Sequence, residues 1–399
     1  MSIAERSEAG AGVAEGVSFS LTDEQRALRE LAHDFAEKEI RPRAAEYDLH
    51  MTHPADVIEK AHAVGLMNLH VPAEYGGPEL GLFDGVLVAE ELSWGCSGIG
   101  TSLGCNGLGA APVVIAGSDE QKRSWLPPLL EEPILCSFGL SEPDAGSDVA
   151  RIKTTATRRG DEYVLNGSKT FITNAGYSSW TVVFAKTDAA AGHRGLSAFV
   201  VPMDTPGVTV EKHLDKMGQR STDTSAFAMA DAVVPAANRL GEEGDGFKIA
   251  MQTLDSTRPA TAIGGIGVAR AAFEHACEYA KERVTFDQPI AMHQGVNFLI
   301  ADMATKIEAA RLLTWQAAWM LDHGWGRKAT LYSSMAKRFA ADTAMEVTTD
   351  AVQIFGGYGY MKEYPVEKLM RDAKLYQIYE GTSQIQRLVI ARDVLIPRD

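Results

Sequence analysis

Glu380 is the side chain in this sequence whose surroundings point most directly to chemistry. It stands in the stretch QIYEGTSQIQRL, between an aromatic residue and Gly381. Apolar residues recur at helical spacing on both sides, which predicts two helices with a break over residues 379–382. A carboxylate at such a break, partly removed from water, has its pKa raised toward the range of a general base. Taken alone, the local pattern favours a plainer interpretation, a solvated glutamate in a loop.

Composition limits the classes of function. The 399 residues are enough for two or three domains, and 45% of them are hydrophobic, as in an ordinary globular protein. The 53 acidic side chains outnumber the 38 basic ones, which gives a net charge of -15. No long run of Lys and Arg interrupts this acidic balance, so phosphate backbones would be repelled. Nucleic acid is therefore not an expected partner.

The cysteines and the ends of the chain indicate a cellular setting. The cysteines form no CxxC pair and lie among apolar residues, so we interpret them as small buried hydrophobes in a reducing compartment. No uninterrupted apolar run approaches the roughly 20 residues that span a bilayer. The first 17 residues lack an apolar signal core and carry acidic residues, unlike a transit peptide. We predict a loose tail over residues 1–21, no metal, no membrane insertion and a cytoplasmic protein.

Periodicity divides the rest of the chain into three regions. Thr22 and Gln25 form a capping-box pattern that opens an amphipathic helix, and helical segments continue to about Leu130. Short segments rich in β-branched residues follow, and Asn166-Gly167 between two of them predicts a hairpin turn. The helical period then returns over four long segments, 247–283, 294–322, 327–355 and 364–395. The predicted class is α+β, with an N-terminal α-helical domain (22–135), a middle β-barrel-like domain (136–244) and a C-terminal four-helix bundle (245–399).

Gly264, Gly265 and Gly267 interrupt the first helix of the predicted bundle. The GIG spacing is part of a dinucleotide-binding fingerprint, but no strand precedes it. Close packing between helices explains these glycines better. We therefore do not predict a Rossmann site.

Five motifs, in order along the chain, resemble those of the acyl-CoA dehydrogenase family. They are LSEPDAGSD at 140–148, FITNAG at 171–176, ERVTFDQPIAMHQ at 282–294, QIFGGYGY at 353–360 and YEGTSQIQR at 379–387. The likeness covers the chain from about Thr22 and is closest to the medium-chain members. It implies a FAD-dependent enzyme of fatty acid β-oxidation that converts a fatty acyl-CoA to the trans-2-enoyl-CoA.

The resemblance also implies how the chemistry is divided. Glu380 matches the catalytic base that takes the α proton, while flavin N5 accepts the β hydride. The backbone N–H of the base residue and a ribityl hydroxyl of the flavin polarise the thioester carbonyl. Some relatives carry the base at the position of Thr257, where threonine cannot do that work. For Arg258 the alternative is a surface salt bridge to Asp255. The implied substrate-binding residues are Ser147, Leu254, Asp255, Arg258, Tyr379 and Gly381.

For FAD, the resemblance implies contacts from both the middle domain and the bundle. Phe171 would form a wall behind one face of the isoalloxazine, although FIT alone would suit the second strand of a hairpin. Arg283 would bind the diphosphate region. Gly356-Gly357 would allow close approach to the ADP half, although a helix C-terminal cap is an equally ordinary use. The implied FAD-binding residues are Phe138, Leu140, Ser141, Phe171, Thr173, Arg283, Thr285, Phe286, Gln294, Gln353, Gly356, Gly357, Thr382 and Gln384.

Partners follow from the same resemblance. The family draws its ADP contacts from more than one subunit, which implies a homo-oligomer, most simply a tetramer packed through the bundles. Electrons would pass to an electron-transfer flavoprotein. The alternatives are an acyl-CoA oxidase-type flavoenzyme, which the chain length disfavours, and a silent flavin-binding scaffold, which the presence of Glu380 and Arg258 disfavours. We expect room for a straight acyl chain of several carbons beside Tyr379, next to the small residues Gly98, Gly100, Thr101 and Gly104.

Overall fold

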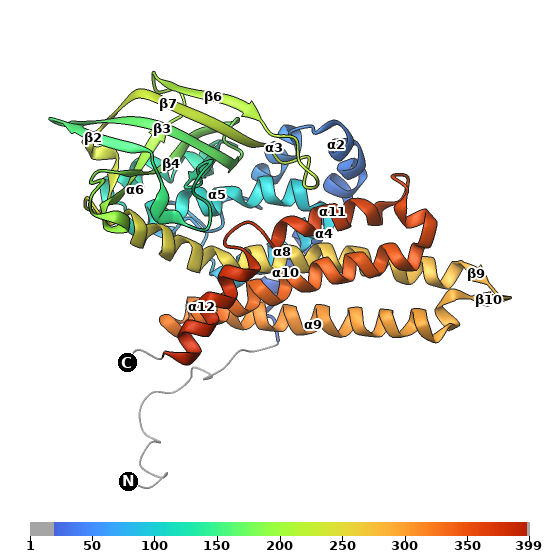
Figure 1. The fold of residues 1–399 in the computed structure, drawn as a ribbon. Coiled ribbons are helices and arrows are strands. Elements are labelled where there is room, and N and C mark those ends of the chain that lie inside the picture. The colour runs from blue at the N-terminus through green and yellow to red at the C-terminus, as the bar shows by residue number, and fades with distance from the viewer. Residues whose placement is uncertain (1–19, 397–399) are drawn as a thin grey trace, which may run out of the picture.

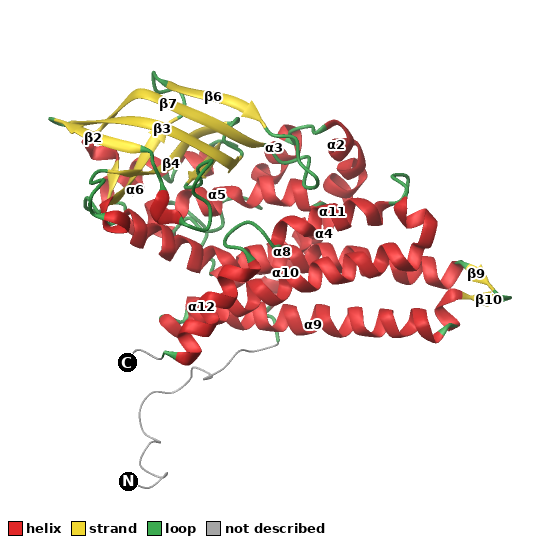
Figure 2. Ribbon diagram, viewed as in Figure 1, coloured by secondary structure: helices red, strands yellow, loops and turns green. Residues whose placement is uncertain are grey.

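The computed structural model describes residues 20–396. Helices come first, strands follow, and long helices complete the chain, so the predicted fold class is confirmed. Figure 2 shows most strands gathered above the long helices, while one short two-stranded hairpin lies apart at the right-hand end of those helices. The predicted loose tail lies outside the described residues, except for Ser20 and Leu21.

The N-terminal region is helical throughout. Thr22 Oγ1 accepts a 3.2 Å hydrogen bond from the Gln25 backbone N–H, and the Gln25 side chain accepts one of 3.1 Å from the Thr22 backbone N–H. The predicted capping box is therefore confirmed. The helices are α1 (Asp23–Phe35), α2 (Ala44–His50), α3 (Ala55–Ala63), α4 (Leu82–Gly95), α5 (Ser97–Ala116), α6 (Asp119–Trp125) and α7 (Pro128–Glu131).

The middle region is one sheet that curls around its own core. The strand order is β6-β7-β3-β2-β4-β5-β8, and β1 pairs in parallel with β4. Tyr163 and Phe227 from one half of this order share a buried cluster with Val183 and Phe199 from the other half, which fits the barrel-like prediction. The strands are β1 (Leu135–Gly139), β2 (Thr155–Arg159), β3 (Glu162–Thr173), β4 (Ser178–Lys186), β5 (Leu196–Pro202), β6 (Val208–His213), β7 (Thr224–Pro235) and β8 (Arg239–Leu240).

The hairpin turn predicted at Asn166-Gly167 is wrong. Strand β3 continues through both residues, and the chain reverses earlier, at Gly160 between β2 and β3. The Asn166 side chain donates a 3.0 Å hydrogen bond to Asp231 on β7, where the ladder shifts register. Gly167 has a φ of +147° in this irregularity. Residues that tolerate positive φ suit a β-bulge as well as a turn, and here they serve the bulge.

The C-terminal region consists of long helices that lie side by side (Figure 1). The four predicted segments are present, but the last one is divided into α11 and α12. Helix α8 packs against the other bundle helices and also against α4 and α5, so it joins the bundle to the N-terminal region. The elements are α8 (Gly246–Glu282), β9 (Val284–Thr285), β10 (Gln288–Pro289), α9 (Gln294–Asp322), α10 (Arg327–Phe355), α11 (Pro365–Tyr376) and α12 (Ser383–Leu395).

Helix α5 is the apolar centre of the molecule. By length and composition alone it is the one described helix that could cross a membrane. Its side chains Ile99, Leu103 and Val113 are buried, and the helix packs against α4, α8 and β1. Burial in the protein core therefore accounts for its composition.

The glycines within α8 serve close packing, as predicted. A Cβ added at Gly264 would lie 2.9 Å from the Tyr376 hydroxyl, and one added at Gly267 would lie 2.4 Å from the Glu90 carbonyl oxygen. A larger residue at either position would push α8 away from α11 or α4.

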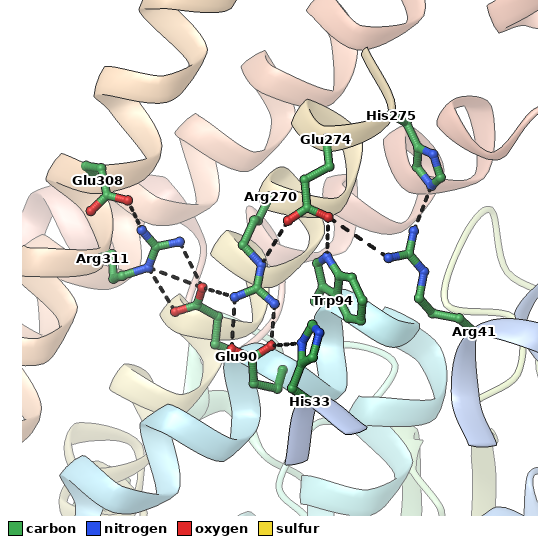
Figure 3. Close-up of polar contacts among 10 residues, drawn as sticks. His33, Arg41, Glu90, Trp94, Arg270, Glu274, His275, Glu308 and Arg311 are labelled. Atoms are coloured by element: carbon green, nitrogen blue, oxygen red, sulfur yellow. Dashed lines mark hydrogen bonds and ion pairs between the residues drawn. The ribbon is translucent and has the colours of Figure 1, made fainter. Parts of the chain in front are cut away.

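A network of charged side chains joins α4 to α8 and α9 (Figure 3). Arg270 on α8 lies 2.9 Å from a Glu90 oxygen and also pairs with Glu91. Arg311 on α9 approaches Glu90 at 2.9 Å, and His33 on α1 approaches Glu91 at 2.8 Å. Burial acts to raise the pKa of Glu91, but the hydrogen bond and charge of Arg270 outweigh it and hold that pKa below its ordinary value. Both buried carboxylates therefore lie against basic side chains.

Arg270→Met should lower the free energy of unfolding by about 3 to 5 kcal/mol, because it leaves two buried carboxylates without their shared cation. Arg123→Met on α6 removes only an exposed ion pair with Asp119, and should cost less than about 1 kcal/mol. Urea denaturation of both variants measures the difference. Equal losses would show that the Glu90-Glu91 network is worth no more than a surface contact.

Candidate active site

Glu380 lies in the connection between α11 and α12, so the predicted break is confirmed. Figure 1 shows this red connection next to α8. Glu380 and Gly381 have φ angles of +51° and +86°. Left-handed backbone is ordinary for glycine but strained for glutamate, and strain of this kind concentrates at functional sites.

The Glu380 carboxylate is partly buried and faces α8. The Thr257 hydroxyl donates a 2.9 Å hydrogen bond to its Oε2. Burial raises the pKa of Glu380 above its ordinary value. Hydrogen bonds from Thr261 and Thr257 partly oppose the rise, as do the charges of Lys337 and Arg258. The solvated-loop interpretation is therefore wrong, and the carboxylate has the properties of a general base.

Arg258 and Asp255 lie on α8 close to Thr257. Arg258 is only 4% exposed and pairs with Asp255, which also accepts a 3.2 Å hydrogen bond from Thr330. The salt bridge considered for Arg258 is thus formed, but in the interior and not at the surface. Its Nε has no hydrogen-bond partner among residues 20–396, so a buried cation keeps one donor for a ligand. Leu254 packs partly buried against the apolar cluster on the outer face of the sheet.

The middle-domain residues predicted to face a flavin come together where β1 ends beside β3. The Thr170 backbone N–H donates a 3.0 Å hydrogen bond to the Ser141 carbonyl oxygen. Phe171 has a φ of +59°, and 68% of it is exposed. FIT lies at the end of β3, the second strand of the β2–β3 hairpin, so that alternative is confirmed as well; this end of β3 pairs with β7. The exposed ring presents a flat apolar surface beside the rest of the group, which is Phe138, Leu140, Ser141 and Thr173.

Cys105 on α5 connects this group to Glu380. Its Sγ lies 3.7 Å from the Thr173 carbonyl oxygen. Burial, and next the charge of Glu380, raise the pKa of the Cys105 thiol to about 12. The end of β3, α5 and the α11–α12 connection therefore border one region. Ser147 is exposed in the loop that follows β1.

A second group of predicted residues lies at the far end of α8. Arg283, Thr285, Gly356 and Gly357 line a cavity of about 420 Å³. The Arg283 guanidinium lies 5.7 Å from the Tyr358 ring centroid, and no carboxylate of the described chain forms an ion pair with it. Gly356 caps α10 with a φ of +60°, as in the alternative, but a Cβ added at either glycine would meet no atom within 4 Å. An open cavity with an unpaired cation suits a phosphate-bearing ligand.

The two groups are far apart in one chain. Helix α8 has 37 residues, which is about 55 Å at 1.5 Å per residue. Thr257 lies in its first third and Arg283 follows its end, so roughly 40 Å separate them. A single dinucleotide cannot contact both groups of one chain. The far end of α8 is also where Phe286, Gln294 and Gln353 lie. Next to Glu380 lie Gln384 and Thr382, and Thr382 caps α12 with a 3.1 Å hydrogen bond.

The small residues of α5 leave less room than predicted. A Cβ at Gly98 would lie 2.3 Å from the Ser221 hydroxyl, and one at Gly100 would lie 3.1 Å from the α4 backbone. These glycines serve close packing and do not enlarge a pocket. Gly104 has nothing within 4 Å of an added Cβ, so the prediction of open space holds there alone.

Gln219 is a site residue that the sequence did not indicate. It accepts a 3.1 Å hydrogen bond from Thr101 and donates one of 3.3 Å to the Tyr379 hydroxyl. It is 1% exposed and has a φ of +48°, with its backbone N–H bound to Asp372 on α11. The segment GQRST is typical of an exposed polar turn, so no local signal marks it. Thr101, Gln219 and Tyr379 together form a polar wall next to Glu380.

Three family models match most of the chain. They are the acyl-CoA dehydrogenase N-terminal domain over residues 22–133, the middle domain over 137–232 and the C-terminal domain over 244–395. Among curated relatives, an acyl-CoA dehydrogenase of Bacillus subtilis is 45% identical and is aligned over 94% of this chain and 99% of its own. Cyclohex-1-ene-1-carbonyl-CoA dehydrogenase of Geobacter metallireducens is also 45% identical, over 94% and 99%.

Solved structures share the whole fold. Butyryl-CoA dehydrogenase of Megasphaera elsdenii has a TM-score of 0.92 and 43% identity, over 95% of this chain and 100% of its own. A chain in the structure described as electron transferring flavoprotein of Acidaminococcus fermentans has a TM-score of 0.93 and 44% identity, over 96% and 100%. PigA with FAD and proline has a TM-score of 0.91 and 30% identity, over 96% and 100%. The relatives differ in their named substrates, and the matches do not single out medium-chain enzymes.

Glu380→Gln should raise the melting temperature at neutral pH. The folded carboxyl has a pKa above the ordinary value of 4.5, so the folded state binds the proton more tightly than the unfolded state. Stability then falls as pH rises from about 4.5 through the folded pKa, and the amide avoids this loss. Melting curves from about pH 4 to pH 8 should show an advantage that grows with pH, while exposed Glu363→Gln should show none. An advantage that shrinks as pH rises would contradict the raised pKa.

Proposed function

We propose that this chain, which belongs to the acyl-CoA dehydrogenase family and is an acyl-CoA dehydrogenase, uses Glu380 to remove the α proton of a fatty acyl-CoA on the way to the trans-2-enoyl-CoA. The observation that carries this proposal is the partly buried carboxylate on a left-handed turn, with its pKa raised by burial. Thr257, at the other position where the family carries a base, has no group that accepts a proton at neutral pH. It acts instead as a donor that orients the carboxylate.

The same turn offers a donor to the substrate carbonyl. The α proton of a thioester is weakly acidic, so the carbonyl must be polarised as the proton leaves. The Glu380 backbone N–H has no acceptor within residues 20–396, although Tyr379 and Ser383 on either side are hydrogen-bonded. A thioester carbonyl bound to this N–H would lie beside the carboxylate. One residue would then supply both the base and a donor where negative charge develops.

FAD is the cofactor that the residues fit, and members of this family bind it. The exposed Phe171 ring would cover one face of the isoalloxazine, and Leu140, Ser141 and Thr173 would supply polar contacts. When bound, FAD would accept the hydride from the β carbon. Cys105 and the end of β3 connect this surface to Glu380, which supports a base and a cofactor on two sides of one substrate chain. An electron-transfer flavoprotein as the acceptor is supported by the match to the Acidaminococcus structure.

A second copy of the chain would complete the FAD site. Thr257, which binds Glu380, and Arg283 are roughly 40 Å apart along α8, so the residues that bind the ADP half of a FAD placed beside Glu380 would come from another chain. The cavity is open and its arginine is unpaired, as expected of half a site. Leu331, Met335 and Phe339 on α10 are only partly buried and add apolar surface for assembly. A homotetramer packed through the bundles is the proposed form.

The acyl group would lie between Glu380 and α5, with Gly104 at its open side. The polar wall of Thr101, Gln219 and Tyr379 would limit the length of the acyl group, and the packed glycines would add no further space. A straight acyl group of short to medium length is therefore the proposed substrate, within the medium-chain resemblance of the motifs.

Glu380→Gln should bind acyl-CoA while losing turnover, because the amide keeps the shape of the side chain but cannot accept the α proton. Flavin reduction should slow by about 10² to 10⁴. Anaerobic stopped-flow bleaching with a series of straight-chain acyl-CoAs measures it, and Glu363→Gln is the matched control for the same chemical change. Near-wild-type bleaching by the Glu380 variant would exclude it as the base.

Arg283→Ala should lower FAD occupancy and loosen the oligomer together, because FAD shared between chains stabilises the assembly by mass action. Lys281→Ala, an exposed change two positions earlier, should affect neither. Native mass spectrometry over a dilution series records both quantities. A monomer that keeps its full complement of FAD would contradict the shared site.

A further inference from the structure

Lys337 is a buried lysine directly behind the Glu380 turn. It lies in the first half of α10 and is 0% exposed. Its Nζ donates a 2.6 Å hydrogen bond to the carbonyl oxygen of Gly381, the residue after Glu380. No carboxylate of residues 20–396 is within ion-pairing distance of it. An ammonium without a direct ion-pair partner is costly to bury, so packing alone is a poor reason for lysine at this position.

Gln386 binds the same peptide groups from the other side. Its Nε2 donates to the Glu380 carbonyl oxygen at 3.2 Å and to the Gly381 carbonyl oxygen at 3.0 Å, and the side chain is fully buried. Asp342, also on α10, binds the ends of the turn through Gln377 at 2.9 Å and Ser383 at 3.0 Å. The turn is therefore held by three side chains, of which only Lys337 places a positive charge at its centre.

The charge of Lys337 acts on Glu380 as well as on the carbonyl. Burial lowers the pKa of Lys337 to about 8, and the strongest opposing effect is the charge of Glu380. In turn, the charge of Lys337 lowers the pKa of Glu380 and opposes the effect of burial. Other ionisable groups face the pair from three more elements and from α10 itself. They are Arg258 on α8, which is itself paired with Asp255, Cys105 on α5, Tyr379 beside the turn, and Asp342 on α10.

We propose that Lys337 is a positioning residue for the reaction: its ammonium fixes the left-handed turn through the Gly381 carbonyl and supplies the positive charge that a half-buried carboxylate base requires. It does not touch the substrate or the reacting atoms. The role rests on the proposed function of Glu380 as the base, and it extends that function to a group 43 positions earlier in the chain that no motif marks.

Two substitutions separate the hydrogen bond from the charge. Lys337→Met removes both, whereas Lys337→Gln removes the charge and keeps an N–H donor for Gly381. Lys216→Met is the matched control, since Lys216 is another mostly buried lysine whose Nζ binds a backbone carbonyl, that of Thr222, and burial lowers its pKa to about 8 as well. The groups that act on Lys216 do not include Glu380.

The probe is acetyl-CoA, which has α protons but no β carbon, so it reports proton removal without oxidation. Deuterium incorporation from D₂O is followed by NMR with each FAD-loaded protein over about pH 5.5 to 9.5. Loss of a nearby opposite charge should shift the acid limb of the exchange rate to higher pH in both Lys337 variants, with a loss of at least about tenfold at pH 6.5. On the high-pH plateau, the Lys337→Met variant should also exchange more slowly than wild type, whereas the Lys337→Gln variant should not. Lys216→Met should lower the melting temperature without shifting the acid limb of the exchange rate.

An unchanged acid limb in Lys337→Gln would overturn the charge role, and an equal high-pH plateau in Lys337→Met and Lys337→Gln would overturn the role of the hydrogen bond. If Lys337→Met does not fold, the Gln variant still decides the charge role, and its plateau against wild type decides whether a neutral donor holds the turn. Failure of the wild-type protein to exchange acetyl-CoA would count against Glu380 as the base, and is therefore distinguishable from failure of the Lys337 proposal.

Discussion

The left-handed turn at Glu380 and Gly381 is the constraint on which the rest of the site depends. A base that works near neutral pH must be withdrawn from water, yet a withdrawn carboxylate tends to keep its proton. The structure meets both conditions with a short break between two helices. Backbone strain at Glu380 aims the side chain toward α8, and hydrogen-bond donors and charges from α8 and α10 surround it. The turn is held by α10 and α12, so the stability of the bundle is what keeps the strained residue in place.

Helix α8 connects the Glu380 turn to α4, to α11 and to the Arg283 cavity. Its first third faces Glu380, its glycines allow α4 and α11 to approach closely, and its end carries the cavity around Arg283. The same helix holds Arg270, which anchors two buried carboxylates of α4. A helix this long also separates the two halves of the proposed cofactor site. The proposed assembly rests on that separation, because only another chain could bring an Arg283 cavity close to a given Glu380.

Much of the fold could be predicted from local patterns. The capping box at Thr22, the helical periods and the break around Glu380 each depend on neighbours in sequence, and each is present in the structure. The hairpin turn predicted at Asn166-Gly167 was wrong because residues that tolerate positive φ occur in bulges as well as in turns. Only the pairing of β3 with β7 distinguishes the two. The open space predicted beside Gly98 and Gly100 was wrong for a similar reason, since the atoms that fill the space beside a glycine come from other segments of the chain.

The parts of the site that the sequence could not indicate are those set by tertiary contacts. Lys337 lies in a stretch of α10 where a lysine suits an exposed face, and only the approach of the α11–α12 connection shows that it is buried and bound to Gly381. Gln219 lies in a polar segment, and its place beside Tyr379 depends on Asp372 of α11. The family resemblance indicated the proposed base and the outline of the proposed FAD site. It carried no information on the groups behind the turn.

A crystal structure of the protein with FAD and a non-reacting acyl-CoA analogue tests the central claim most directly. It should show a Glu380 carboxylate oxygen at about 3 Å from the α carbon and the thioester carbonyl bound to the Glu380 backbone N–H. The ADP half of each FAD should contact Arg283 of a different chain from the one that supplies Glu380. A carboxylate turned away from the α carbon, with another acidic group in its place, would contradict the role of the turn.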